Sequence, residues 1–67
     1  MSKLSERLLE LRKGNSLSQE VAAQNFGVMM RAYQRYEYGE RDPKLATLIK
    51  IADFYGVTLD YLVGRSD

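Results

Sequence analysis

Residues 18–37 read SQEVAAQNFGVMMRAYQRYE, and the spacing within this stretch sets the fold of the chain. Apolar residues recur at helical spacing on both sides of Gly27, and glycine readily adopts the left-handed backbone conformation that ends a helix. The small side chain of Ala23 lets two helices approach closely. The stretch therefore predicts helices over residues 19–26 and 29–37, crossing at roughly 90–120°.

The second of these helices has an apolar side and a polar side. Val28, Tyr33 and Tyr36 lie at helical spacing and are expected to face inward. Because the two helices cross steeply, the polar side is expected to stand out from the body of the protein. An α-helix fits the major groove of DNA, about 12 Å wide, where arginine pairs with guanine and glutamine with adenine. The side chains expected on this outer side are Met30, Arg31, Gln34 and Arg35.

Three further helices are predicted outside this stretch, and no strand is predicted. Leu4, Leu8 and Leu11 form an apolar stripe that predicts a helix over residues 4–13. The solvent-facing side of this helix and its edges are expected to carry polar side chains, namely Ser5, Arg7, Glu10 and Arg12.

Turn and cap residues indicate the remaining two helices. Asp42 as N-cap and Pro43 as the first helical residue predict a fourth helix, which ends at Gly56. Thr58 is expected to cap a short fifth helix over residues 59–63. The sequence thus predicts an all-α protein, a compact five-helix domain that spans all 67 residues as a single domain.

The composition excludes several classes of function. The chain has neither cysteine nor histidine, so zinc ligands and Cys–His or Ser–His nucleophile pairs are absent. We therefore expect no metal, no cofactor and no enzymatic activity. The first fifteen residues carry six charges, unlike a signal peptide, and no apolar run approaches the ~20 residues of a membrane span. A soluble cytoplasmic protein without membrane association is expected.

The net charge of +1 is small for a nucleic-acid binder, but the charge is unevenly distributed. Residues 1–45 contain eight Lys or Arg and six Asp or Glu, whereas residues 46–67 contain two and three. Residues 28–36 contain two arginines and no acid. The positive charge is therefore concentrated, though mildly, around the second of the two crossing helices.

A set of residues spread over nearly the whole chain carries a family resemblance. The set comprises Leu11-Arg12, Leu17-Ser18-Gln19-Glu20, Ala23, Phe26-Gly27-Val28, Arg35-Tyr36-Glu37, Gly39, Pro43, Leu48, Ile51-Ala52 and residues 56–62. In this order and spacing, residues 8–64 resemble the phage Cro and repressor proteins, a helix-turn-helix family of XRE-like transcriptional regulators. The resemblance implies a repressor-type domain in which the second and third helices form the helix-turn-helix.

The same resemblance implies a function and a set of contacts. It implies a transcriptional regulator, a repressor, that binds double-stranded DNA at a palindromic operator as a homodimer, encoded by a prokaryote or phage and associated with the nucleoid. The base-reading positions are Met30, Arg31, Gln34 and Arg35. Phosphate contacts are expected from Gln19, Arg41 and Lys44, and from the hydroxyl of Tyr33, and Gln19 is also expected to brace the reading helix.

Two structural roles also follow from the resemblance. Arg12 and Glu37 match an arginine and a glutamate that commonly form an interior ion pair between the first and third helices. Leu59, Tyr61 and Leu62 lie in the final helix, where many members dimerise. These three side chains form either a dimer patch or a lid on the core.

The sequence departs from the family pattern at three positions. Met29 stands where the family usually has Ser or Thr, so the third helix lacks a cap and is expected to start late or fray. Tyr33 replaces an inward aliphatic residue, and Ala22 replaces a large aliphatic one, which makes room for the ring. The missing cap and the low net charge leave a second interpretation open, a protein-interaction module on the same fold, such as an antitoxin head or a co-activator, with weak or no DNA binding.

Overall fold

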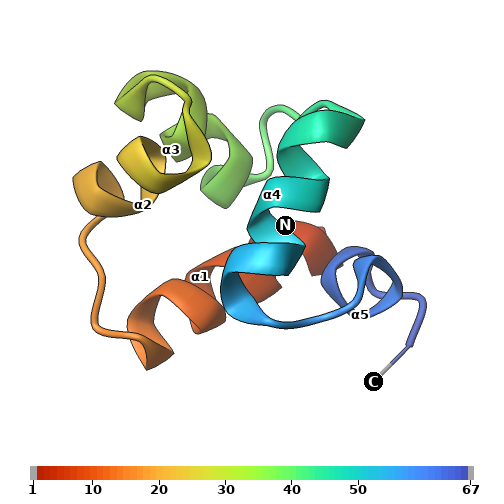
Figure 1. The fold of residues 1–67 in the computed structure, drawn as a ribbon. Helices are drawn as coiled ribbons and strands as arrows, with labels where there is room; N and C mark the ends of the chain where they lie inside the picture. Colours follow the sequence, from red (N-terminus) through yellow and green to blue (C-terminus); the bar gives the residue numbers. More distant parts are fainter. Residues whose placement is uncertain (1, 67) are drawn as a thin grey trace.

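The computed structural model describes residues 2–66, which fold into five α-helices with no strand among them (Figure 1). The helices are α1 (Lys3–Gly14), α2 (Gln19–Phe26), α3 (Met30–Tyr38), α4 (Leu45–Tyr55) and α5 (Leu59–Val63). α2 and α3 pack together at one side of the molecule, and α5 lies at the other side, against α1 and α4 (Figure 1). The predicted all-α, five-helix architecture is confirmed.

One fully buried side chain from each helix contributes to a shared core. These side chains are Leu8, Phe26, Tyr33, Ile51 and Leu62, from α1 to α5 in order. Burying a large apolar side chain contributes about 1.5–3 kcal/mol, whereas helices as short as these are marginal on their own in water. The helices therefore stabilise one another, and α3 is held by the side that carries Tyr33.

Side-chain caps set the start of α2 and α5, as predicted. The Ser18 hydroxyl accepts a hydrogen bond from the Val21 N–H at 3.1 Å, and the Thr58 hydroxyl accepts one from the Tyr61 N–H at 3.0 Å. Met29 offers α3 no such hydrogen bond, and α3 begins only at the next residue. α3 therefore starts directly after its N-cap position, as α2 does after Ser18, and the expected late start is wrong even though the side-chain cap is missing.

α1 differs from the prediction at two of its polar residues. The sequence pattern places Ser5 and Arg7 toward solvent, but both are buried. The Arg7 guanidinium donates hydrogen bonds to the backbone carbonyls of Tyr61 and Ser66, and it lies 4.0 Å from the centre of the Tyr61 ring. The Ser5 hydroxyl donates to the Ser2 carbonyl at 2.8 Å. For Arg7 the prediction is wrong because this side chain packs against α5, a contact that the periodicity of α1 does not reveal.

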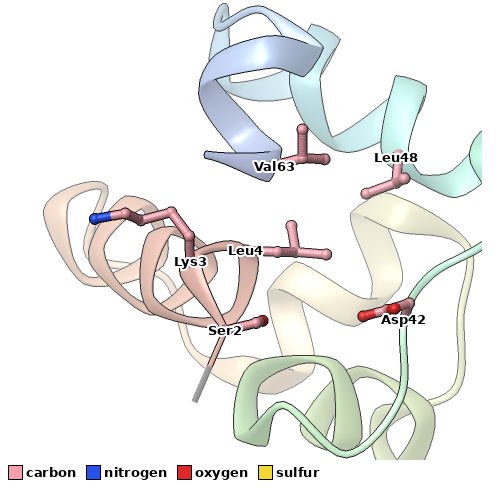
Figure 2. A pocket seen from close by; sticks show the side chains of 6 residues that line it. All are labelled: Ser2, Lys3, Leu4, Asp42, Leu48 and Val63. Atoms are coloured by element: carbon pink, nitrogen blue, oxygen red, sulfur yellow. The ribbon is translucent and has the colours of Figure 1, made fainter. Parts of the chain in front are cut away.

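The start of α4 also differs from the prediction. Asp42 does not cap a helix and Pro43 is not its first residue, because α4 begins only at Leu45. Pro43 is buried in the loop before the helix, and α4 begins two residues after it. Asp42 instead lines a pocket of about 280 Å³, together with Ser2, Lys3, Leu4, Leu48 and Val63 (Figure 2). None of these residues belongs to α2 or α3, so the pocket is separate from the crossing helices.

Candidate nucleic-acid interface

The turn at Gly27 sets the direction in which the chain leaves α2. Gly27 has a φ of +68°, and the Val28 N–H donates to the Ala23 carbonyl at 3.1 Å, as is typical of a glycine that ends a helix. A Cβ atom at this position would lie 3.4 Å from Nζ of Lys50. Residues other than glycine rarely adopt this backbone conformation. The orientation of α3 therefore depends on Gly27.

α3 has one buried side and one exposed side. The buried residues, at helical spacing, are Tyr33, Tyr36 and Glu37. The exposed residues include three of the four predicted base readers, Met30, Arg31 and Arg35. The fourth, Gln34, is only half-exposed at the boundary between the two sides. The structure thus brings the four predicted base readers together on one helix, with Gln34 less accessible than expected.

The two exposed arginines of α3 are available to bind an anion. Neither Arg31 nor Arg35 forms an ion pair with an acid among residues 2–66. The acid in α3 itself, Glu37, lies on the buried side. A guanidinium carries five N–H donors, which suit a phosphate group or the major-groove edge of guanine. The exposed side of α3 is therefore a cationic surface rich in hydrogen-bond donors.

The expected ion pair between Arg12 and Glu37 is present and joins α1 to α3. Arg12 Nε and Nη2 donate to the two carboxylate oxygens of Glu37 at 2.8 and 2.9 Å, and Nη1 donates to the Leu17 carbonyl at 2.9 Å. Burial acts to raise the pKa of Glu37, but hydrogen bonds from Arg12 and Gln19 outweigh it, so this pKa lies below its usual range. The hydrogen bond to Glu37 raises the pKa of Arg12. Both groups stay ionised and hold α3 against α1.

Two glutamines extend this contact toward the exposed side of α3. Gln19 Nε2 donates to Glu37 Oε1, and Gln34 Nε2 donates to Gln19 Oε1, each at 3.2 Å. The family resemblance implies that Gln19 contacts phosphate and braces the reading helix, and that Gln34 reads a base, but it does not identify Gln34 as the partner of Gln19. They lie 15 positions apart, on different helices, and only the crossing of α2 and α3 brings them together.

Tyr33 is not a phosphate contact, contrary to the prediction. Its side chain is 0% exposed, and its hydroxyl is buried near Glu37 with no hydrogen bond of ordinary geometry. Burial, followed by the neighbouring carboxylate, raises the pKa of this phenol, so it remains neutral. Ala22 is also fully buried, in keeping with the space predicted for the ring. The ring fills the core so completely that the hydroxyl cannot reach DNA.

The loop between α3 and α4 carries the other predicted phosphate contacts. Arg41 and Lys44 are both exposed, and neither pairs with an acid among residues 2–66. Lys44 stands at the N-cap position of α4, where it makes no side-chain capping bond. Both cations are therefore accessible, and their contact with phosphate stays a prediction.

The predicted dimer patch on α5 is not a continuous exposed surface. Leu62 is 0% exposed and belongs to the core, so its assignment to a dimer patch is wrong. Leu59 is half-buried against the same core, and Tyr61 is half-buried under the Arg7 guanidinium. Of the two alternatives left open by the sequence, the lid on the core therefore describes Leu62.

Between residues 2 and 66, His, Cys, Asp and Glu form no group of three or more that could hold a metal ion. In the same part of the chain, no helix has both the length and the apolar character needed to cross a bilayer.

Several known proteins are similar to this chain over nearly its whole length. The cryptic phage CTXphi transcriptional repressor RstR of Vibrio cholerae is 41% identical over 63 residues, which cover 94% of this chain and 57% of the repressor. The HTH-type transcriptional regulator YqaE of Bacillus subtilis (strain 168) is 42% identical over 59 residues, covering 88% of this chain and 51% of the regulator. The chain thus spans little more than half the length of these relatives.

A solved structure and a family model agree with these relatives. The crystal structure of a transcriptional regulator from Listeria innocua superposes with a TM-score of 0.89 at 30% identity, covering 96% of this chain and 60% of that one. The family model described as helix-turn-helix matches residues 8–62, which include α2, the turn at Gly27 and α3. The chain therefore belongs to the helix-turn-helix family, and the resemblance inferred from its sequence is confirmed.

Proposed function

We propose that this chain binds double-stranded DNA in a sequence-specific way, as the DNA-reading part of a transcriptional regulator, with α3 in the major groove. The observation that carries the proposal is the pair of exposed arginines on α3, Arg31 and Arg35, which no acid among residues 2–66 neutralises by direct contact. Membership of the helix-turn-helix family supports it, as does the similarity to a phage transcriptional repressor and to a transcriptional regulator. Family membership likewise supports a binding role over a catalytic one.

The proposed contacts divide into base reading and backbone binding. Arg31 and Arg35 donate to base edges, and Met30, 42% exposed, lies against a thymine methyl group. Arg41 and Lys44 donate to phosphates, which position the helix without reading sequence. The second N–H of the Gln19 amide, beyond the one bound to Glu37, is available for a phosphate as well.

We further propose that the regulator is a repressor that acts as a homodimer on a palindromic operator. A two-fold dimer of this kind reads two half-sites about 34–36 Å apart, one turn of the DNA helix. The name of the V. cholerae relative, a phage repressor, favours repression. The proposed setting is the cytoplasm of a prokaryotic cell, at the nucleoid.

Selection of bound sequences from a random duplex library tests the function. We expect a palindrome to emerge, and Arg31→Ala to weaken binding to it by about tenfold or more through the loss of one base contact. Arg65→Ala, which removes another exposed arginine, beyond α5, is the matched control and should have little effect. Affinity should also fall steeply with salt, because cations that bind phosphates displace counterions. No selected sequence, or equal losses in the two variants, would contradict the proposal.

A protein-interaction module is the second candidate, and one observation favours it. Leu45 and Ile49 lie one turn apart on α4 and are 66% and 43% exposed, and neighbouring exposed apolar side chains are a feature of protein-interaction surfaces. The same DNA selection separates the candidates, because the module predicts no sequence preference and no difference between Arg31→Ala and Arg65→Ala.

A further inference from the structure

Two methionines stand side by side at the start of α3, and packing does not account for either. Met29 is 79% exposed, more than any other large apolar side chain between residues 2 and 66, and Met30 is 42% exposed. Neither belongs to the hydrophobic core or to the half-buried residues around it. The two thioether groups therefore lie open to solvent at one end of the helix that is proposed to enter the major groove.

The thioether is the only sulfur group in this chain, because the chain contains no cysteine. A two-electron oxidant such as hydrogen peroxide transfers one oxygen atom to the sulfur, which loses two electrons, and the peroxide is reduced to water. Reductases, one for each epimer at the sulfur, reverse the change: thiols supply two electrons, and the oxygen leaves as water. Because both side chains are exposed, Met29 and Met30 are open to this reversible modification without any movement of the fold.

At Met30, oxidation acts on a proposed base contact. Met30 is the first residue of α3 and directly precedes Arg31. In the proposed complex its apolar side chain lies against a thymine methyl group. The sulfoxide oxygen carries a partial negative charge and requires a hydrogen-bond donor, which a methyl group does not provide. Oxidised Met30 therefore loses an apolar contact and leaves a polar group desolvated without a partner.

At Met29, oxidation acts on the end of the helix. Met29 occupies the N-cap position, and its side chain makes no capping hydrogen bond. A sulfoxide here adds a second partial negative charge to an end of α3 that has to approach the anionic phosphates of DNA. Because neither methionine lies in the core, both sulfoxides are compatible with the folded domain. Oxidation is therefore expected to change DNA binding with little change in stability.

We infer that Met29 and Met30 form a reversible oxidation site that regulates DNA binding: sulfoxide formation lowers the affinity of α3 for DNA, and reduction restores it. The inference rests on the proposed function, since it concerns the surface that is proposed to read bases. Met29 stands where the resembled family usually has Ser or Thr, so the fold itself does not require this thioether. The paired methionines place the proposed reading surface under the control of a peroxide-type oxidant.

Treatment of the wild-type protein with hydrogen peroxide tests the inference. Tandem mass spectrometry locates the added oxygen atoms, and affinity for a duplex selected from a random library is measured before and after treatment. We expect oxygen on Met29 and Met30 and a loss of affinity of about tenfold or more, the size of one base contact. Incubation with both sulfoxide reductases should restore the original affinity. The melting temperature of the oxidised protein should stay close to that of the untreated one.

The double variant Met29→Leu/Met30→Leu is the matched control. Leucine keeps an apolar side chain of similar volume and contains no sulfur. Whatever its own affinity for the duplex, this variant should bind equally well before and after peroxide treatment. Met1 remains oxidisable in the variant, so the comparison also separates the pair in α3 from the remaining methionine.

Several outcomes would overturn the inference and leave the proposed function intact, because the untreated protein still selects a sequence. Met29 and Met30 could resist a peroxide concentration that oxidises free methionine, or wild type could keep its affinity when both carry oxygen. The double variant could lose as much affinity as wild type, or the reductases could remove the oxygen without restoring binding. Unfolding of the oxidised protein would likewise overturn it. If untreated wild type selects no duplex, the proposed function fails, and the inference falls with it.

Discussion

Glu37 is a buried carboxylate balanced by one arginine, and this makes the stability of the protein depend on pH. Its pKa lies below the usual value of about 4.3, so the ionised pair contributes fully above about pH 4.3 and loses its contribution as the pH falls through the lower folded-state pKa. We expect Glu37→Gln to lower the free energy of unfolding at pH 7 by about 3 kcal/mol, because Arg12 loses its counter-charge. At pH 3 this difference should shrink.

Urea unfolding at pH 7 and pH 3 measures the effect. Glu40→Gln is the matched control, since Glu40 is exposed and should change the stability by less than about 0.5 kcal/mol at either pH. An equal loss for Glu37→Gln at both pH values would show that the charge is not responsible.

The Tyr55 hydroxyl is buried without a hydrogen-bond partner among residues 2–66, and burial raises the pKa of this phenol to about 12. Tyr55→Phe removes a desolvated polar group, so it is expected to raise the free energy of unfolding by about 1 kcal/mol at pH 7. The unfolded phenol ionises near pH 10, so wild-type stability falls as the pH rises from 10 toward 12, and the variant should lose less. Denaturant unfolding at pH 7 and pH 11 measures both effects. If Tyr55→Phe is less stable than wild type at pH 7, the claim that the hydroxyl lacks a hydrogen-bond partner is wrong.

Among the helix ends, two glycines are expected to respond in opposite ways to the same substitution. Gly27 ends α2 with a φ of +68°, so Gly27→Ala should lower the free energy of unfolding by about 1–2 kcal/mol. Gly14 is the last residue of α1, and a Cβ there meets no atom within 4 Å. Gly14→Ala should therefore raise stability by about 0.5–1 kcal/mol, through a less flexible unfolded chain. Urea unfolding of the two variants compares them directly, and equal stabilities would refute the role given to Gly27.

Adding the missing cap of α3 is expected to stabilise the protein, whereas most substitutions destabilise a protein. Met29 has the extended backbone of an N-cap residue, φ −72° and ψ 149°, and makes no side-chain capping bond. Met29→Ser should raise the stability by about 1 kcal/mol, because a serine hydroxyl can accept from a free N–H in the first turn, as Ser18 does for α2. Thermal melting of Met29→Ser against Met29→Ala measures it, since alanine cannot cap. The capping explanation fails if the two variants melt at the same temperature.

Local signals explain which helix boundaries could be predicted from the sequence. α2 and α5 begin where Ser18 and Thr58 provide capping oxygens, and these contacts span only three residues. The start of α4 could not be predicted, because the burial of Pro43 depends on packing against other helices. The same holds for Arg7, whose carbonyl partner on Tyr61 lies 54 positions further along the chain.

At the scale of the whole molecule, some residue positions in the proposed site follow from local sequence patterns, and others depend on packing between distant helices. The outward position of Arg31 and Arg35 follows from the periodicity of α3 alone and could be predicted. The depth of Tyr33 and the burial of Leu62 depend on how five helices close around one core, so their predicted surface roles are wrong. The contact between Gln34 and Gln19 depends on the angle between α2 and α3, which no pattern in either helix specifies.

The central claim is that the exposed side of α3 binds a DNA duplex, at the side of the molecule away from α5 (Figure 1). An NMR titration of the isotope-labelled protein with a short DNA duplex at low salt tests this claim most directly. The account predicts that the amide resonances of α3, of residues 39–42 and of Lys44 shift with added DNA, while those of α5 stay in place. Shifts confined to α4 and α5, with α3 unchanged at saturating DNA, would contradict it.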